Sequence, residues 1–337
     1  MLRLSRADDG PHAVGPEIHH SESVYLNAID PSGPIGGFFR VGERPRQGQA
    51  EVTACLYLPE GDVLFSFARP ATGPVPTFSA GGLRWEVLEP FERWHLAYEG
   101  TVLRLVEPGL LADPGRAYRE CPRVRLAVDW EVQAAAPAVG GEPAEPQERP
   151  GEEFARGHYE QLVVVSGTLS VDGRPQTFGG AGLRDHSWGP RHWHAPWYYR
   201  WCTACSGPSF GFAATWLARR DGGTLRTGFV WDDGQLLPLG DLELATSWRE
   251  PELWQETISL RFATPARRYQ VAGRVLRCLP LRHRRVGETG PGADPGGGLT
   301  RITEGLARFE LDDGRVAYGI AEYLDQLEAG RPVGLSV

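Results

Sequence analysis

A short stretch of the chain, residues 184–201, concentrates side chains that can do chemistry. It reads Arg-Asp-His-Ser-Trp-Gly-Pro-Arg-His-Trp-His-Ala-Pro-Trp-Tyr-Tyr-Arg-Trp, with one acid, three histidines, four tryptophans, two tyrosines and three arginines. Because buried ionisable groups are costly unless they are paired, folding alone rarely selects this mixture. Desolvation beside indole rings favours the acid form of a carboxyl, and the ring faces attract cations. The segment could therefore donate a proton and stabilise the cation that results.

Asp185 and His186 are the candidate acid and its partner. A general acid works best when its pKa lies near the working pH, and a neighbouring imidazole can hold such a carboxyl. The alternative is a carboxylate locked onto Arg184 or Arg191 as a structural ion pair. On a regular strand His186 and Trp188 face one side and Asp185 the other, so His186 could instead be the reactive residue.

The aromatic residues that follow could form the wall of a binding site. They could cage a cation or grip a polyene, or they could only fill a wide barrel interior. His186, His192 and His194 form a possible metal set, but no Glu or Cys completes a known ligand spacing, so we expect no metal and no cofactor. We predict catalytic roles for Asp185, His186 and Trp188, and substrate contacts from Tyr25, Glu160, Trp193, His194, Trp197, Tyr198 and Tyr199.

Two geometric expectations follow from these assignments. His186, Trp188 and at least one of Trp193, Trp197 or Tyr199 should line one cavity that also touches the N-terminal part of the chain. A hairpin could also bring Glu160 beside Arg184, where a structural salt bridge is the plainer use of that carboxylate.

The composition is that of a globular protein, and it excludes several classes of function. The chain has 337 residues, of which 41% are hydrophobic and 23% charged, enough for two domains with real cores. All 35 basic residues are arginine, so lysine Schiff-base chemistry is excluded. A net charge of −8 without a basic face argues against a nucleic-acid partner. No glycine-rich nucleotide-binding fingerprint follows a strand, so nucleotide cofactors have no support.

The sequence shows no targeting or membrane-spanning pattern. The sequence begins without an apolar stretch of signal-peptide length, and no run approaches the roughly 18 apolar residues of a membrane span. Five cysteines, an odd number, are typical of reduced thiols, and Cys202 and Cys205 should face opposite sides of a strand. We therefore expect a cytoplasmic protein without an integral membrane segment.

Short runs rich in Val, Leu, Phe, Trp and Thr, separated by Gly, Pro or Asp-Gly turns, predict an all-β fold of antiparallel barrels or sandwiches. We expect less than about a tenth of the residues in helix. Turns are predicted at 98–101 and at Asp172-Gly173, and the 3.6-residue pattern of 320–329 predicts the one helix. A Pro/Gly/Ala/Glu-rich stretch around residues 133–151 predicts a boundary between domains 1–145 and 146–337.

The stretch Gly-Ala-Gly-Leu-Arg-Asp-His-Ser-Trp-Gly-Pro-Arg at 180–191 resembles the motif of the carotenoid 1,2-hydratase (hydroxyneurosporene synthase) superfamily. Segment 22–31 is similar to the opening strand of that family, and segments 304–310 and 317–323 are similar to its closing strands. The resemblance implies two lipocalin-like β-domains in tandem with a largely apolar cavity at their junction. It also implies hydration, cyclisation or pericyclic chemistry. The second Tyr-x-Asp acid of the carotenoid enzymes is not found here at the spacing after the tryptophan that is associated with that family.

Two classes of function remain open. As an enzyme, the protein would act on an unsaturated hydrophobic small molecule, isoprenoid-like or polyketide-like, by acid-initiated hydration or cyclisation. A pericyclase that shapes its substrate without proton transfer is the second form of that class. As a carrier, it would only solubilise a hydrophobic ligand. Ionisable groups within the aromatic wall favour the enzyme, since a carrier of apolar ligands gains nothing from burying them. The sequence leaves the oligomeric state open.

Overall fold

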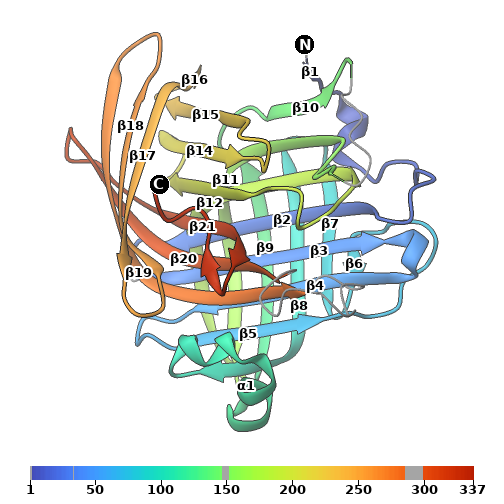
Figure 1. The fold of residues 1–337 in the computed structure, drawn as a ribbon. Coiled ribbons are helices and arrows are strands. Elements are labelled where there is room, and N and C mark those ends of the chain that lie inside the picture. Colours follow the sequence, from blue (N-terminus) through green and yellow to red (C-terminus); the bar gives the residue numbers. More distant parts are fainter. Residues whose placement is uncertain (1, 33, 146–151, 285–298) are drawn as a thin grey trace.

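The computed structural model describes residues 2–32, 34–145, 152–284 and 299–337. The chain forms two strongly curled antiparallel sheets that lie against each other (Figure 1). Strands account for 65% of the residues and helices for 6%, so the predicted all-β class and the low helix content are confirmed.

The first sheet contains twelve strands and takes up the N-terminal part of the chain. The strands are β1 (Leu2–Arg3), β2 (His20–Asp30), β3 (Ile35–Arg44), β4 (Gln49–Tyr57), β5 (Val63–Ala68), β6 (Ser79–Ala80), β7 (Leu83–Glu89), β8 (Arg93–Leu105), β9 (Arg123–Ala134), β10 (Val139–Pro143), β11 (Gly157–Val171) and β12 (Arg174–Pro190). Pairing runs β11–β12–β2–β3–β4–β5–β8–β9 and returns to β11. These strands therefore close a barrel, which encloses a core of buried side chains that includes Trp94 and Trp130.

The second sheet contains ten strands from the C-terminal part of the chain. They are β13 (Tyr198–Cys205), β14 (Phe210–Ala218), β15 (Thr224–Asp232), β16 (Gln235–Pro238), β17 (Gly240–Arg249), β18 (Trp254–Ala263), β19 (Arg268–Arg284), β20 (Leu299–Leu311), β21 (Val316–Glu328) and β22 (Arg331–Pro332). The sheet curls around its own core, in which Phe212 packs against Phe262 and Phe309. The predicted architecture of tandem barrel-like units is therefore confirmed.

Helices are few and short. One α-helix, α1 (Pro114–Glu120), begins after Asp113, whose side chain accepts a hydrogen bond from the Arg116 amide. Among the residues that the structure describes, three 3₁₀ turns accompany it: η1 (Arg6–Asp9), η2 (Pro45–Gln47) and η3 (Pro108–Ala112). Within the described residues, no helix has the length and apolar character needed to span a bilayer.

A third apolar core lies between the two sheets. Strand β2 contributes Tyr25, β11 contributes Leu162 and β21 contributes Leu324. Strands at this junction are covered on both faces, and β13 shows the consequence: Cys202 points into the second sheet, whereas Cys205 points into the junction. The predicted opposite orientation of this cysteine pair is confirmed. All five cysteines are buried free thiols.

Two local predictions were wrong. Residues 320–329 were expected to be helical, but most of them belong to strand β21. Because Leu324 packs into the junction and Tyr323 into the second sheet, both faces of the strand are apolar, which imitates a helical pattern. Residues 98–101 were expected to turn, but β8 continues through them and pairs Gly100 with Leu126.

The hairpin predicted at Asp172-Gly173 is confirmed. Both residues have positive φ, 49° and 74°, as expected of a type I′ turn between β11 and β12. The predicted division at residue 145 falls inside the first sheet, because the β11–β12 hairpin returns to pair with β2 and β9. The chain changes sheet between Pro190 and Tyr198, beyond the Pro/Gly-rich stretch.

Candidate functional site

Strand register gathers a row of polar side chains on the outer face of the first barrel. Residues that lie directly opposite on neighbouring strands point to the same face. Across β11, β12, β2, β3 and β4, the row consists of Glu160, Asp185, Tyr25, Arg40 and Thr53. Three of the predicted site residues, Glu160, Asp185 and Tyr25, therefore stand side by side.

A matching row crosses the second sheet. Strands β13, β21 and β20 place Trp201 opposite Glu322, and Glu322 opposite Glu304. The two rows meet at the junction, because Trp201 Nε1 donates to Glu160 Oε1 at 2.7 Å. The Tyr25 and Trp201 rings also meet edge to face, with centroids 5.4 Å apart.

A cavity of about 140 Å³ lies beside these rows, between the two sheets. Its wall is largely apolar and aromatic, with four ionisable Arg and Glu side chains in it. The lining residues are Tyr25, Phe38, Arg40, Thr53, Phe65, Phe67, Arg69, Leu111, Pro114, Tyr118, Trp193, Pro280, Leu281, Ile302, Glu304 and Glu322. An apolar pocket with a few convergent polar groups is the usual form of a small-molecule site. We call it the junction cavity.

Two carboxyl groups of the junction cavity keep their protons at neutral pH. Burial raises the pKa of Glu304 to about 8, although Arg40 acts in the opposite direction. Burial also raises the pKa of Glu322 to about 8, and the negative charge of Asp185 adds to the shift. Glu304 is only 3% exposed, and its Oε2 has no hydrogen-bond partner among the described residues. Both acids could therefore donate a proton to a bound molecule.

The neighbours of Glu322 arrange the polar end of the cavity. The Tyr199 hydroxyl donates a hydrogen bond to Glu322 Oε1. Asp185 itself lies 3.6 Å from His158 Nε2, measured from its Oδ2. Burial raises the pKa of Glu160, the acid hydrogen-bonded to Trp201. The negative charge of Asp185 thus raises the pKa of two acids at this end of the cavity, Glu160 and Glu322.

Arg40 and Trp193 line another part of the junction cavity, where the polar group is a cation and not an acid. The Arg40 guanidinium lies over the Trp193 ring, 5.4 Å from its centroid, and 3.7 Å from Glu51. In the described part of the chain, Arg40 Nη2 is buried without a hydrogen-bond partner. A ligand oxygen in the cavity would satisfy this donor.

His186 and Trp188 do not line this cavity. Alternation along β12 sends them to the inside of the first barrel, while Asp185 faces the junction. The predicted split between the two faces is confirmed, but the expectation of one cavity shared with Trp193 or Tyr199 was wrong. Inside the barrel, His186 Nε2 lies 2.6 Å from Glu22 Oε1, and the Trp188 ring stacks on His12.

Three further predicted contacts lie away from the cavity. His194 is exposed. Trp197 lies under the guanidinium of Arg220, 3.8 Å from it. Tyr198 packs against the core of the second sheet. Of the predicted substrate contacts, Tyr25 and Trp193 line the cavity, and Tyr199 reaches it through its hydrogen bond to Glu322.

The proposed partners of Arg184 also differ from the expectation. Arg184 is fully buried and pairs with Asp9, at 2.7 Å, rather than with Asp185 or Glu160. Asp9 also accepts hydrogen bonds from the Tyr159 hydroxyl and the Trp94 indole, so the buried carboxylate is well satisfied. Asp9 carries no signal in the sequence, because it lies in a polar N-terminal segment.

Sequence reasoning did not single out Glu304 and Glu322. Both lie in the segments that resemble the closing strands of the carotenoid hydratases, at 304–310 and 317–323. The signal available was an acid placed on the apolar face of a strand. On β20, Glu304 shares a face with Ile302 and Leu306, and both of these pack into the junction core.

Comparison with known proteins shows the family to which the chain belongs. The sequence profile of DUF7064, described as a domain of unknown function, matches residues 5–327. The chain belongs to the DUF7064 family. The matched region includes strands of both sheets, so the family model covers both units. No curated protein matches the sequence.

Solved structures share the fold of this DUF7064 protein. A Nitrosomonas europaea protein, NE1406, provisionally named AttH, aligns with a TM-score of 0.56 and 14% identity, over 91% of this chain and 93% of that one. The protein CghA, solved with Sch210972, aligns with a TM-score of 0.53 and 13% identity, over 93% and 90%. These neighbours belong to the lipocalin-like fold family, as expected, whereas the relation to carotenoid hydratases stays a prediction.

Proposed function

We propose that this protein is an enzyme that protonates an unsaturated, hydrophobic small molecule in the junction cavity and so initiates its hydration or cyclisation. The observation that carries the proposal is the pair Glu304 and Glu322, two acids with pKa raised to about 8 in an apolar, aromatic wall. General acids with a pKa near the working pH are the most effective. Glu322 is the proton donor, held by Tyr199.

The surroundings of Glu322 fit this role. Asp185 faces the junction and its negative charge helps to keep the proton on Glu322, so Asp185 acts as a positioning residue rather than as the donor. The aromatic rings of Tyr25 and Phe65 line the cavity and offer negative faces to a carbocation. The cation then takes up water or is attacked by another double bond of the same molecule. Attack by a double bond moves the positive charge to another carbon, which then loses a proton or takes up water. The proton released at that carbon, or by the added water, returns to the Glu322 carboxylate.

The substrate class follows from the lining. Phe38, Phe65 and Phe67 provide apolar area for a chain of isoprenoid or polyketide type. Arg40 offers a buried donor to a carboxylate, enol or carbonyl oxygen at one end of that molecule. CghA, a neighbour with the same fold, was solved with the small molecule Sch210972. That likeness agrees with a small-molecule substrate for the present chain.

Solvent isotope labelling tests the proposal. The purified protein is incubated in D₂O with a panel of polyenes that carry a carboxyl or β-dicarbonyl group, and products are analysed by mass spectrometry. Protonation at carbon places a solvent deuteron in the product, and hydration also adds the mass of water. The Glu322→Gln variant should retain binding, read from quenching of tryptophan fluorescence, but lose about 10²–10⁴-fold in kcat.

The same experiment identifies the two alternatives. A pericyclase would form a rearranged product without solvent deuterium, and Glu322→Gln would leave its rate nearly unchanged. A carrier would quench tryptophan fluorescence on binding without any product. Either result would refute proton transfer by Glu322.

A further inference from the structure

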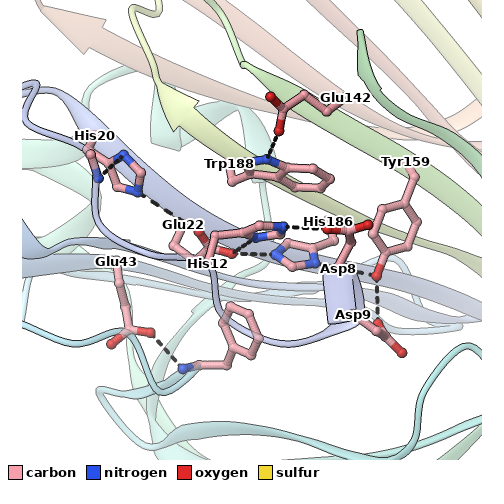
Figure 2. A network of polar contacts seen from close by, with 12 residues as sticks. Asp8, Asp9, His12, His20, Glu22, Glu43, Glu142, Tyr159, His186 and Trp188 are labelled. Atoms are coloured by element: carbon pink, nitrogen blue, oxygen red, sulfur yellow. Dashed lines mark hydrogen bonds and ion pairs between the residues drawn. The ribbon is translucent and has the colours of Figure 1, made fainter. Parts of the chain in front are cut away.

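The His186 side of β12 belongs to a second polar centre, separate from the junction cavity. His12, Glu22 and His186 converge inside the first barrel, where the N-terminal segment crosses β2 and β12 (Figure 2). Among the described residues, one ligand atom from each of these three lies within 4.8 Å of the others. The Glu22 and His186 side chains are fully buried, and that of His12 is 18% exposed.

Both histidines direct a ring nitrogen at the same carboxylate oxygen. His12 Nδ1 lies 3.0 Å and His186 Nε2 lies 2.6 Å from Glu22 Oε1. Zinc bound at about 2.0–2.2 Å in tetrahedral geometry holds neighbouring N and O ligands roughly 3.3 Å apart. Each of these two N···O distances would therefore have to widen by less than an ångström to admit an ion.

The far nitrogen of each ring has its own acceptor. His12 Nε2 lies 3.3 Å from Asp8 Oδ1. His186 Nδ1 lies 3.4 Å from the Tyr159 hydroxyl, which donates its proton to Asp9 and so presents an oxygen lone pair to the ring. With an ion bound, these acceptors would hold the proton on the far nitrogen and leave the inner nitrogen to ligate, and metal-binding histidines almost always have such outer partners. Two lone pairs and a carboxylate then point at one spot, an arrangement that a cation stabilises.

The remaining oxygen of Glu22 is a further ligand atom. Oε2 is buried and, within the part of the chain that the structure describes, accepts no hydrogen bond. His20 Nε2 is 4.0 Å away, too far for a direct bond. His20 Nδ1 accepts the Gly15 amide, so in the neutral ring Nε2 keeps its proton and His20 is no ligand. Glu22 can therefore chelate an ion through both oxygens.

We propose that His12, Glu22 and His186 bind one divalent transition-metal ion, zinc by the chemistry of this N₂O donor set. The carboxylate that the sequence motif lacked is supplied by β2, a strand far from it in the chain. The Trp188 ring stacks on His12 with centroids 3.9 Å apart and covers the ion. The site faces away from the junction cavity, so the ion fastens the N-terminal segment to the barrel and takes no part in the proton transfer.

Metal titration of the full-length protein tests the site. The protein is stripped with a chelator and titrated with Co²⁺, whose visible absorption reports an N/O site, and the bound Co²⁺ is then displaced with Zn²⁺. We expect one equivalent per chain and a higher melting temperature with Zn²⁺. Asp8→Asn, which removes only an outer partner, should weaken binding about 10–100-fold, and His12→Gln should weaken it further.

The matched control is the double variant His192→Gln/His194→Gln. These two histidines lie close together outside the cluster, with ring centroids 5.4 Å apart, and they could bind metal adventitiously. The control should keep the full equivalent of Co²⁺. Because His12 is partly exposed, His12→Gln should fold, and circular dichroism of the stripped protein checks this. The proposal is overturned if wild type binds no stoichiometric metal, or if the double variant loses it and folded His12→Gln keeps it.

Discussion

Glu304→Gln gives a direct test of the electrostatics assigned to the junction cavity. The pKa of Glu304 is raised to about 8 in the folded protein, whereas an ordinary glutamate has a pKa of about 4.5. At pH values between the two, Glu304 keeps its proton in the folded protein and loses it on unfolding. Between these two values the native state binds one more proton than the unfolded state, so the free energy of unfolding falls as pH rises. The difference of about 3.5 pH units corresponds to about 5 kcal/mol in all, at about 1.4 kcal/mol per unit.

Glutamine has the shape of protonated glutamate and does not titrate. We therefore expect the free energy of unfolding of the variant to rise relative to that of wild type, by about 1.4 kcal/mol per pH unit between pH 5 and 8. Above pH 8 this difference should level off. Urea unfolding at half-unit steps from pH 5 to 9 measures this difference. Infrared spectroscopy at pH 7 gives a second readout, because the absorption of protonated carboxyl groups should lose the contribution of Glu304 in the variant and keep that of Glu322.

The control is Glu310→Gln, an exposed glutamate on the same strand β20. Its unfolding profile should run parallel to that of wild type. A Glu304→Gln profile that also runs parallel to wild type over the whole range would show that Glu304 is ionised in the native cavity. The reasoning that makes this cavity a proton-donating site would then fail.

Two further predictions concern strand β12, one for the partner of its Arg184 and one for its Asp185. Asp9→Asn removes the acid paired with fully buried Arg184, and should cost about 3–5 kcal/mol in urea unfolding; a loss below about 1 kcal/mol would contradict the buried pair. Asp185→Asn removes a charge that raises the pKa of Glu322, so the alkaline limit of kcat should move to lower pH while the maximal rate survives. Loss of turnover at every pH in a folded Asp185→Asn protein would instead make Asp185 the proton donor.

The strand pattern predicted the fold well wherever one face of a strand is solvated. It failed at β21, where Leu324 packs into the junction and Tyr323 into the second sheet. Periodicity reports burial on one side, and a strand buried on both sides has none to report. The place where the chain changes sheet, between Pro190 and Tyr198, also has no signal in the composition. Composition marks a Pro/Gly-rich stretch but not the return of the β11–β12 hairpin to β2 and β9.

The candidate site was predicted only in part. The aromatic segment does deliver Trp193 to the cavity and Tyr199 to Glu322. Glu304 and Glu322 are single acids on separate strands, and their closeness arises from the register of β20 with β21. Their raised pKa values come from burial by the first barrel, which lies more than a hundred residues earlier in the chain. No local pattern could contain that information.

The Asp-His-Ser-Trp-Gly motif lies on strand β12, and its residues face both sides of that strand. Neighbouring residues of a strand face opposite sides, so Asp185 meets the acids of the junction while His186 meets Glu22 inside the barrel. The same holds for strand β2, which pairs with β12: its Tyr25 faces the junction, and its Glu22 faces the inside of the barrel. Adjacent residues of one motif therefore belong to two centres, and substitutions at 185 and 186 should be separable: one alters proton transfer, the other alters metal binding.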